Sequence, residues 1–433
     1  MPSRWITLLA LSIASLVGGL APTTSQAQKL EAAYVILGAQ APVARVVITG
    51  ATQCPTITID NTPQPMSIRA EADADFPVLV CEARVPNRAA SASVEGQALP
   101  LPNGTPDAIV AFGDTGCRLK GIDTFLGGAD DREDAGKFQD CDDPSRWPFA
   151  QLSETIVGAK PALVIHVGDY LYRESRCPAT EAGCQGSPHG DNWPTWKADF
   201  FAPAEPLLRA APWIVTRGNH ESCERAGKGY FRLLNPALAG QTPPRCTDLI
   251  PHYTVAAGAR RFIVMDTSSA EDQCSPRTCD NAKYTAEFAS MEAEPGTWLI
   301  SHRPVWGFNQ AWGTITDALQ QALQARRGTL PEGIELVLSG HIHLWEVLSF
   351  ADQRPPQFVL GNGGTLLSEP LTIQFTGQQI GGLEVKRGRS YHGWGYTRFA
   401  PGDTGGGWTA TVYDFTGGLL FSCRVKAADV DCR

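Results

Sequence analysis

Five short apolar segments of the sequence end in side chains that bind metal ions or move protons. These endings are Gly113-Asp114-Thr115-Gly116, Gly168-Asp169-Tyr170-Leu171-Tyr172, Gly218-Asn219-His220-Glu221, Ser301-His302 and Gly340-His341-Ile342-His343. Carboxylate, phenolate, amide and imidazole groups together offer enough ligands for two metal ions of intermediate hardness, such as iron, zinc or manganese. Their joint occurrence predicts a dinuclear metal site.

The distribution of histidines supports this interpretation. The chain contains eight histidines, and four of them, His220, His302, His341 and His343, lie in these endings. Each ending alone is weak, because Asp-Thr-Gly or Gly-Asn-His is typical of a turn. A glycine before the polar residue lets the chain turn sharply and lets a ligand approach the backbone. The set is therefore informative as a whole.

The segments that must position these residues read as strands and helices in alternation. Apolar runs fall at 108–112, 162–167, 213–215, 262–265, 298–300, 335–338 and 358–360, and helix-like segments at 147–157, 196–208, 284–292 and 315–325. Short, fully apolar strands that alternate with helices indicate a sheet covered on both faces, which is an α/β layered fold. Ligands bind such sheets at the carboxyl ends of the strands, where the five endings lie.

The order and spacing of the five motifs resemble those of the calcineurin-like metallophosphoesterases, over about residues 107–365. Within that family the chain resembles the purple acid phosphatase branch, because Tyr172 lies three residues after Asp169 and because of the block His302-Arg303-Pro304-Val305-Trp306. The resemblance implies a four-layer α/β/β/α metallophosphoesterase sandwich.

Roles for individual residues also follow from the resemblance. It implies that a ferric ion is bound by Asp114, Asp169, Tyr172 and His343. It implies a second ion, Zn, Mn or Fe(II), bound by Asp169, Asn219, His302 and His341, so that Asp169 bridges the two. His220 is expected to contact the substrate phosphate and to protonate the leaving oxygen. For Tyr172, a packed aromatic side chain is the alternative.

The implied activity is that of an acid phosphatase that hydrolyses small phosphomonoesters by attack of a metal-bound hydroxide. Two aspartates and one phenolate around Fe(III) and a divalent ion leave a charge of about +2 before hydroxide binds, which suits a phosphate dianion. A phosphodiesterase or nucleotidase with the same site, or a non-catalytic surface or binding protein, are the alternatives.

Other polar residues near the motifs have weaker expectations. Glu221 is expected to hold a histidine or a loop in place. Arg303 donates either to phosphate or to a structural salt bridge. His189 lines the mouth of the site or is solvent-exposed, and His166, inside an apolar run, is expected to be a core residue. His252 and His392 have no predicted function.

Composition and charge limit the class of protein. Hydrophobic residues make up 43% of the 433 residues and charged ones 19%, with 43 Gly and 32 Pro. This composition excludes global disorder and favours a globular protein rich in loops. The net charge of -9 without a basic stripe argues against a nucleic-acid polymer as partner. The oligomeric state is left open.

Residues 1–27 are predicted to be a secretory signal peptide, since Arg4 precedes an apolar run, 5–20, and small residues at 25 and 27. A membrane anchor is the alternative, but the run is shorter than the roughly 20 residues that span a bilayer. After cleavage we expect no membrane span and an exported protein, periplasmic or extracellular.

The cysteines agree with export. Twelve cysteines without a CxxC pair are expected to form disulfides in an oxidising compartment. We predict that sequence neighbours pair, as 54–81, 117–141, 177–184, 223–246, 274–279 and 423–432. The alternative is that several are free buried thiols.

The chain divides into four parts on these patterns. After the signal peptide, residues 28–105 read as a small β-rich N-terminal module that ends in a Pro-rich linker. Residues 106–390 form the catalytic domain, and strands in 391–433 complete it.

Two insertions depart from the family pattern. Asp169 follows Asp114 by 55 residues, and the segment between them carries Cys117, Cys141 and the acidic cluster 130–134. A second insertion, 173–193, carries Cys177 and Cys184. Both are expected to lie beside the metal site, where loops decide which substrate enters.

Overall fold

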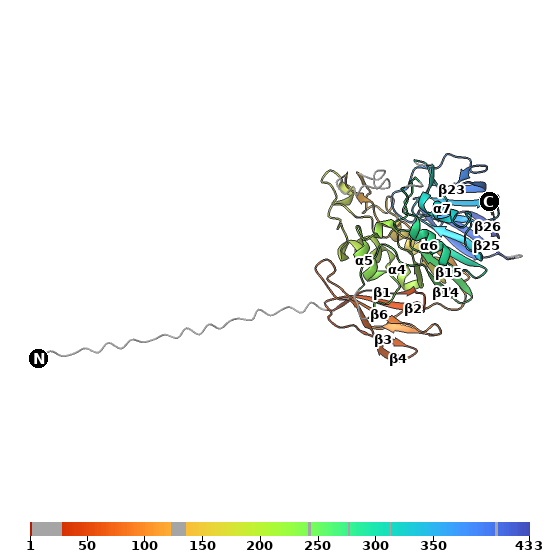
Figure 1. The fold of residues 1–433 in the computed structure, drawn as a ribbon. Coiled ribbons are helices and arrows are strands. Elements are labelled where there is room, and N and C mark those ends of the chain that lie inside the picture. The colour runs from red at the N-terminus through yellow and green to blue at the C-terminus, as the bar shows by residue number, and fades with distance from the viewer. Residues whose placement is uncertain (2–27, 123–135, 241–243, 276–277, 312, 403–405) are drawn as a thin grey trace.

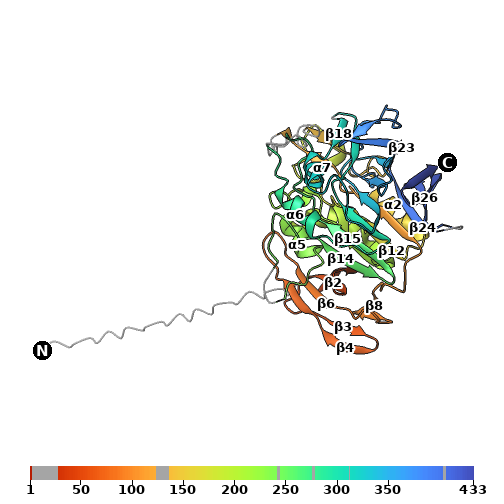
Figure 2. The ribbon, with the colours of Figure 1, turned by 45° about the vertical axis from the view of Figure 1, so that its right-hand side comes forward.

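Two large β-sheets pack face to face in this protein, and helices cover their outer faces (Figure 1, Figure 2). The structure, a computed structural model, describes residue 1 and residues 28–122, 136–240, 244–275, 278–311, 313–402 and 406–433. Apart from Met1, the predicted signal peptide lies outside the described residues, as does the acidic cluster 130–134.

The first sheet has eleven strands in the order β27-β26-β25-β24-β9-β12-β13-β1-β2-β6-β5. Their bounds are β1 (Lys29–Leu37), β2 (Pro42–Thr49), β5 (Ser67–Ala70), β6 (Leu79–Arg84), β9 (Ile109–Phe112), β12 (Leu163–His166), β13 (Trp213–Val215), β24 (Gly395–Pro401), β25 (Trp408–Asp414), β26 (Leu419–Lys426) and β27 (Asp429–Cys432). The neighbours β9, β12, β13 and β1 run parallel, and β24 pairs antiparallel with β9. The C-terminal strands thus extend the sheet on the β9 side.

The N-terminal strands do not all stand apart from the α/β fold. Strand β1 lies parallel to β13, with Ile36 opposite Trp213, and β2, β6 and β5 extend the sheet from there. The strands β3 (Thr56–Ile59), β4 (Thr62–Pro65), β7 (Ala92–Val94) and β8 (Gln97–Ala98) form a separate four-stranded sheet. Within residues 28–105, the β1, β2 and β6 strands therefore belong structurally to the large sheet, because both of their faces are apolar and need cover.

The second sheet has eight strands in the order β14-β15-β16-β19-β21-β20-β23-β22. Their bounds are β14 (Tyr253–Ala257), β15 (Arg260–Met265), β16 (Thr297–Ser301), β19 (Ile334–Ser339), β20 (Trp345–Phe350), β21 (Gln357–Leu360), β22 (Gln379–Ile380) and β23 (Leu383–Tyr391). Two short ribbons lie outside both sheets. They are β10 (Leu119–Lys120) with β11 (Lys137–Phe138), and β17 (Gly307–Asn309) with β18 (Gly313–Ile315).

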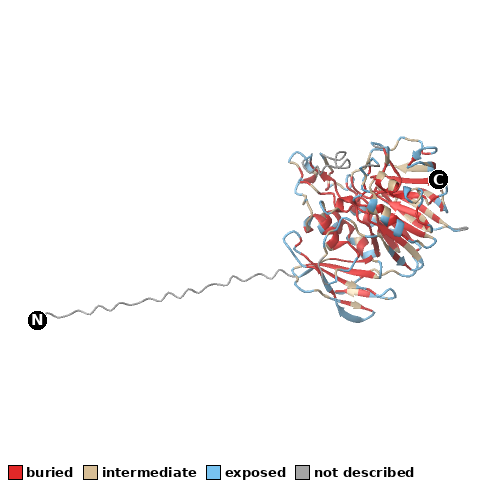
Figure 3. Ribbon diagram, viewed as in Figure 1, coloured by how far each residue is buried: buried red, intermediate tan, exposed pale blue. Residues whose placement is uncertain are grey.

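The helices pack on the two outer faces. Against the first sheet lie α2 (Phe149–Gly158), α3 (Trp193–Trp196), a π-helical turn (Lys197–Phe201), α4 (Ala202–Ala210) and α5 (Gly227–Leu233). Against the second sheet lie α6 (Ala282–Ser290) and α7 (Asp317–Gln324). A third apolar core, with Ile165 from one sheet and Leu338 from the other, fills the space between the sheets (Figure 3). The predicted four-layer α/β/β/α sandwich is confirmed.

This topology brings the five motifs to one edge. Strands β9, β12 and β13 are parallel neighbours in register, since His166 pairs with both Phe112 and Val215. In the second sheet β16 and β19 are likewise parallel, with Ile300 opposite Leu338. All five motifs follow the carboxyl ends of these strands, where the two sheets meet.

All twelve cysteines pair, and each pairs with its sequence neighbour as predicted. Three of these disulfides, at Cys117–Cys141, Cys177–Cys184 and Cys223–Cys246, close loops that follow motif-bearing strands. Within the described ranges, no helix is long and apolar enough to cross a membrane.

Candidate metal centre

The backbone is strained at three of the predicted ligands. Asp114, Asp169 and His341 adopt positive φ angles of 58°, 59° and 72°. Non-glycine residues rarely adopt this left-handed conformation, which costs on the order of 1 kcal/mol or more each and tends to cluster at functional sites. The strain turns each side chain from its strand end into the space between the sheets.

Two glycines before predicted ligands are required by close packing of the site itself. A Cβ on Gly340 would lie 2.3 Å from Oδ2 of Asp114, and a Cβ on Gly218 would lie 2.0 Å from Oδ1 of Asp169. Real Cβ atoms do not approach other atoms this closely, so a side chain at either position would displace an aspartate. The glycines in these motifs therefore make room for the carboxylates.

One cluster of donor atoms surrounds the phenol of Tyr172. Its Oη lies 3.0 Å from Oδ1 of Asp114, 2.8 Å from Oδ2 of Asp169 and 3.0 Å from Nε2 of His343. The phenol has one proton to share among these groups, so hydrogen bonding alone does not explain their convergence. Two carboxylates, a phenol and an imidazole form a donor set that suits a hard trivalent cation.

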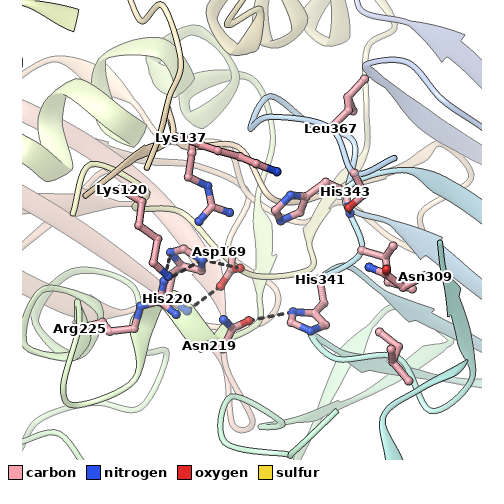
Figure 4. Close-up of a pocket in the computed structure, with 14 residues that line it drawn as sticks. Lys120, Lys137, Asp169, Asn219, His220, Arg225, Asn309, His341, His343 and Leu367 are labelled. Carbon is pink, nitrogen blue, oxygen red and sulfur yellow. Dashed lines mark hydrogen bonds and ion pairs between the residues drawn. The ribbon is translucent and has the colours of Figure 1, made fainter. Parts of the chain in front are cut away.

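A second cluster adjoins the first. The amide oxygen of Asn219 lies 2.9 Å from Nε2 of His302 and 2.9 Å from Nδ1 of His341, and Figure 4 shows Asn219 and His341 pointing toward each other. Nε2 of His302 is also 3.2 Å from Oδ2 of Asp169. The same aspartate oxygen therefore belongs to both clusters, as a bridging ligand requires.

The histidines of the second cluster are oriented by their other ring nitrogens. His302 donates from Nδ1 to the carbonyl of Val167 at 2.8 Å, and Nε2 of His341 lies 2.7 Å from Oδ2 of Asp272. Such contacts fix the ring and its tautomer, which leaves the remaining nitrogen with a lone pair for a metal. The seven predicted ligands thus lie in two adjoining groups that fit two metal ions.

Burial sets the electrostatics of this centre. Burial, with the charge of Asp169 beside it, raises the pKa of Asp114 to about 7. Although burial opposes a charged imidazole, Asp169 raises the pKa of His302 to about 9. Hence, without a cation, protons partly neutralise the crowded carboxylates. Bound cations would take over this role.

His220 lies at the side of the first cluster. Its ring centroid is 3.9 Å from that of Tyr172, and its Nε2 is 3.8 Å from Oδ2 of Asp169. Nδ1 lies 3.0 Å from a carboxylate oxygen of Glu174. Burial and the charge of Arg225, whose Nη2 is 2.8 Å from Nδ1, lower the pKa of His220 to about 3. The imidazole is thus held beside the centre without belonging to either cluster.

Glu221 holds the motif loops, as expected. Its carboxylate accepts hydrogen bonds from the backbone N–H groups of Gly218, Asp169, Tyr170 and Leu171. Burial, with Asp169 nearby, raises the pKa of Glu221 to about 8. It therefore connects the loop after β12 to the loop after β13.

Sequence reasoning missed four residues that support the site. Glu174 and Arg225 flank His220, and Arg225 forms an ion pair with Glu174. Asp272 contacts His341, and Asp199 accepts hydrogen bonds from the backbone of Cys117 and Tyr172. Glu174, two residues after Tyr172, was the one with a local signal. The others approach from distant loops.

The remaining histidines and Arg303 lie as follows. Arg303 forms an ion pair with Asp272, so the salt-bridge interpretation is the one the structure favours. His166 is fully buried and stacks on Tyr170, as expected of a core residue. His189 and His392 are exposed, and neither lines the pocket over the centre. His252 pairs with Glu287.

Comparison with known proteins agrees with this geometry. A family model described as calcineurin-like phosphoesterase matches residues 108–344. Purple acid phosphatase 22 from Arabidopsis thaliana is 23% identical over 197 residues, which span 42% of this chain and 42% of that protein. The chain therefore matches less than half the length of this relative.

Two solved structures share the fold. The purple acid phosphatase PPD1 from yellow lupin (Lupinus luteus) seeds has a TM-score of 0.53 at 14% identity, over 90% of this chain and 73% of the lupin chain. A structure described as PhoD also has a TM-score of 0.53, at 11% identity, over 93% of this chain and 91% of its own. At these identities the likeness concerns the fold.

Proposed function

Because the chain belongs to the calcineurin-like phosphoesterase family, we propose that it is an exported acid-phosphatase-like enzyme that hydrolyses small phosphomonoesters at a dinuclear metal centre. The observation that carries the proposal is the position of Oδ2 of Asp169. It lies 2.8 Å from the phenol of Tyr172 and 3.2 Å from Nε2 of His302, so one atom is shared by both donor clusters.

We assign one ion to Asp114, Asp169, Tyr172 and His343, and the other to Asp169, Asn219, His302 and His341. A phenolate is a hard ligand, so Tyr172 favours Fe(III) in the first position, with Zn, Mn or Fe(II) in the second. When bound, such a pair supplies positive charge for phosphate and acidifies water at neutral or acidic pH.

His220 is the proposed proton donor to the leaving oxygen. Glu174 holds Nδ1 at 3.0 Å, which leaves Nε2 on the side of Asp169. The stacked ring of Tyr172 limits rotation of the imidazole. An oriented imidazole beside the reacting phosphate is the arrangement that general-acid catalysis requires.

Export is part of the same proposal. Six disulfides fit an oxidising compartment. Together with the predicted signal peptide, they support a periplasmic or extracellular location. The acidic net charge of -9 supports small esters over nucleic-acid polymers as substrates.

The test compares a phosphomonoester with a phosphodiester. Purified protein is assayed with p-nitrophenyl phosphate and bis-p-nitrophenyl phosphate from about pH 4 to about pH 9, a range that brackets the titration of carboxylates and imidazoles. Metal content is measured on the same preparation. We expect faster turnover of the monoester, and faster turnover of the diester would replace the proposal with a phosphodiesterase.

The matched variant is Asp169→Asn, which keeps the shape of the side chain and removes the bridging charge. We expect this variant to lose both metals and activity. Full activity of Asp169→Asn, or no turnover of either ester by metal-replete wild-type protein, would contradict the proposal.

A further inference from the structure

The pocket over the centre has an unusually cationic wall. Arg118, Lys120, Lys137 and Arg225 line it, whereas Asp169 is the one carboxylate among the described residues of its lining. In Figure 4, Lys120 and Arg225 lie on one side of Asp169, and Asn309 and His341 lie on the other. The cations therefore gather on the His220 side of the pocket.

Three of these cations come from the β10–β11 ribbon and the residue before it. Lys120 and Lys137 are direct partners across the ribbon, and the Cys117–Cys141 disulfide closes the loop that carries it. Like charges placed directly opposite each other destabilise a strand pair. The ribbon thus holds two ammonium groups close together at a cost to its own stability.

The other cations lie against the centre itself. The guanidinium carbon of Arg118 is 4.2 Å from the centroid of the Tyr172 ring, and Arg225 contacts the ring of His220. Arg118 and Lys120 are each only 1% exposed. Burying cations beside a metal pair that is itself cationic is costly, unless a ligand brings more negative charge than the metals take up.

One carboxylate lies among these cations. Glu174 forms an ion pair with Arg225, and its other oxygen lies 3.8 Å from Nζ of Lys120. Arg225 and Lys120, with the opposing charge of Glu174 between them, and Burial-side neighbours apart, Arg225 and Lys120 compensate a strong depression of the pKa of the Glu174 carboxyl. A single carboxylate does not match two lysines and two arginines in charge.

The opposite wall is mostly uncharged. Ile315, Ile342 and Leu367 provide apolar surface there, and Asn309 and Ser368 provide neutral polar groups. An organic group can pack on this wall while anionic groups face the cations. The two walls together describe a ligand with a neutral body and more than one phosphate.

We propose that the substrate is a phosphomonoester that carries a second phosphate group, and that Arg118, Lys120, Lys137 and Arg225 bind this second group. This inference rests on the proposed phosphatase function and names its substrate class. Water adds to the scissile phosphorus, the P–O bond to the leaving group breaks, and the leaving oxygen takes a proton from His220. Inorganic phosphate leaves, and the second phosphate stays on the other product.

The test uses matched substrate pairs that differ by one phosphate. They are glucose 6-phosphate with glucose 1,6-bisphosphate, and adenosine monophosphate with adenosine diphosphate, which separate carbon-linked from pyrophosphate-linked second groups. The second phosphate should raise kcat/KM about tenfold or more in at least one pair, the effect of one charge-assisted hydrogen bond. High salt should reduce this ratio.

The variant is Lys137→Met, with Lys426→Met as the matched control. Both remove one positive charge, but Lys426 is exposed on β26 and does not line the pocket. Lys137→Met should lower the ratio by a factor of about three or more, since one ion pair with the second phosphate is lost. Lys426→Met should leave the ratio unchanged.

Direct binding gives a readout that does not need turnover. Calorimetric titration with propane-1,3-diphosphonate and with propylphosphonate should show tighter binding of the diphosphonate, and the difference should shrink in Lys137→Met. Monoester turnover with a ratio near one in the wild type, or a high ratio unchanged in Lys137→Met, would overturn this inference alone. Absence of turnover for every ester would instead overturn the proposed function.

Discussion

Asp199 tests whether the position of Tyr172 is set by buried support from a distant helix. The carboxylate is fully buried on the π-helical turn. Its Oδ1 accepts from the backbone N–H of Cys117 at 3.0 Å and from Nε of Arg173 at 2.7 Å. Its Oδ2 accepts from the backbone N–H groups of Tyr172 at 2.7 Å and Arg173 at 3.0 Å. It therefore joins the loop after Asp114 to the loop that carries Tyr172.

The perturbation is Asp199→Asn, which keeps the shape but leaves one acceptor oxygen. Whichever oxygen the amide keeps, two donors then face an NH2 group. Each unsatisfied buried donor costs about 1–3 kcal/mol, and a buried cation that loses its partner costs about 3–5 kcal/mol. Burial already raises the pKa of Asp199, so the neutral amide regains part of this cost. We expect a net loss of about 3 kcal/mol.

The assay is the free energy of unfolding from denaturant titration, with metal content and monoester activity measured on the folded protein. Asp429→Asn is the control, because Asp429 forms only exposed ion pairs with Lys386 and Arg387, which are worth about 0–1 kcal/mol. Displacement of Tyr172 should also weaken metal binding. If Asp199→Asn had the stability, metal content and activity of Asp429→Asn, the reasoning about this carboxylate would be refuted.

Two further predictions concern other buried carboxylates. Glu346 is buried with one oxygen lacking a hydrogen-bond partner among the described residues, and burial raises its pKa well above 4.5. Because a raised folded pKa costs stability as the pH rises above the unfolded value, Glu346→Gln should gain stability relative to wild type between acid and neutral pH, in denaturant titrations at each pH. An equal difference at both pH values would contradict this. Asp272→Asn should lower metal affinity about 10–100-fold by releasing His341. Unchanged metal content under chelator competition would contradict it.

The motif residues were predictable because type and position agree. Asp114, Asp169, Asn219, His302 and His341 each follow the end of an apolar strand, and parallel strands present such ends at one edge. The structure brings all of them together. The disulfides were predictable for a related reason, because each closes a short excursion of the chain.

The supporting residues were not predictable from local pattern. Asp199 and Asp272 look like any surface aspartate in the sequence, and only the tertiary fold buries them against Tyr172 and His341. Strand β1 was expected in a separate module, yet it pairs with β13 across more than 170 residues of chain. The opposition of Lys120 and Lys137 likewise depends on the ribbon that the insertion forms. Such long-range pairings have no signal in a single sequence.

The most direct test of the account is the visible spectrum of the purified protein together with its elemental analysis. If Tyr172 binds Fe(III) in a dinuclear centre, the protein contains two metal ions per chain, at least one of them iron. It then shows a broad tyrosinate-to-iron charge-transfer band, which disappears in Tyr172→Phe. A colourless, fully active protein that contains only zinc or manganese, or a band that persists in Tyr172→Phe, would contradict the assignment of Tyr172 as a ligand.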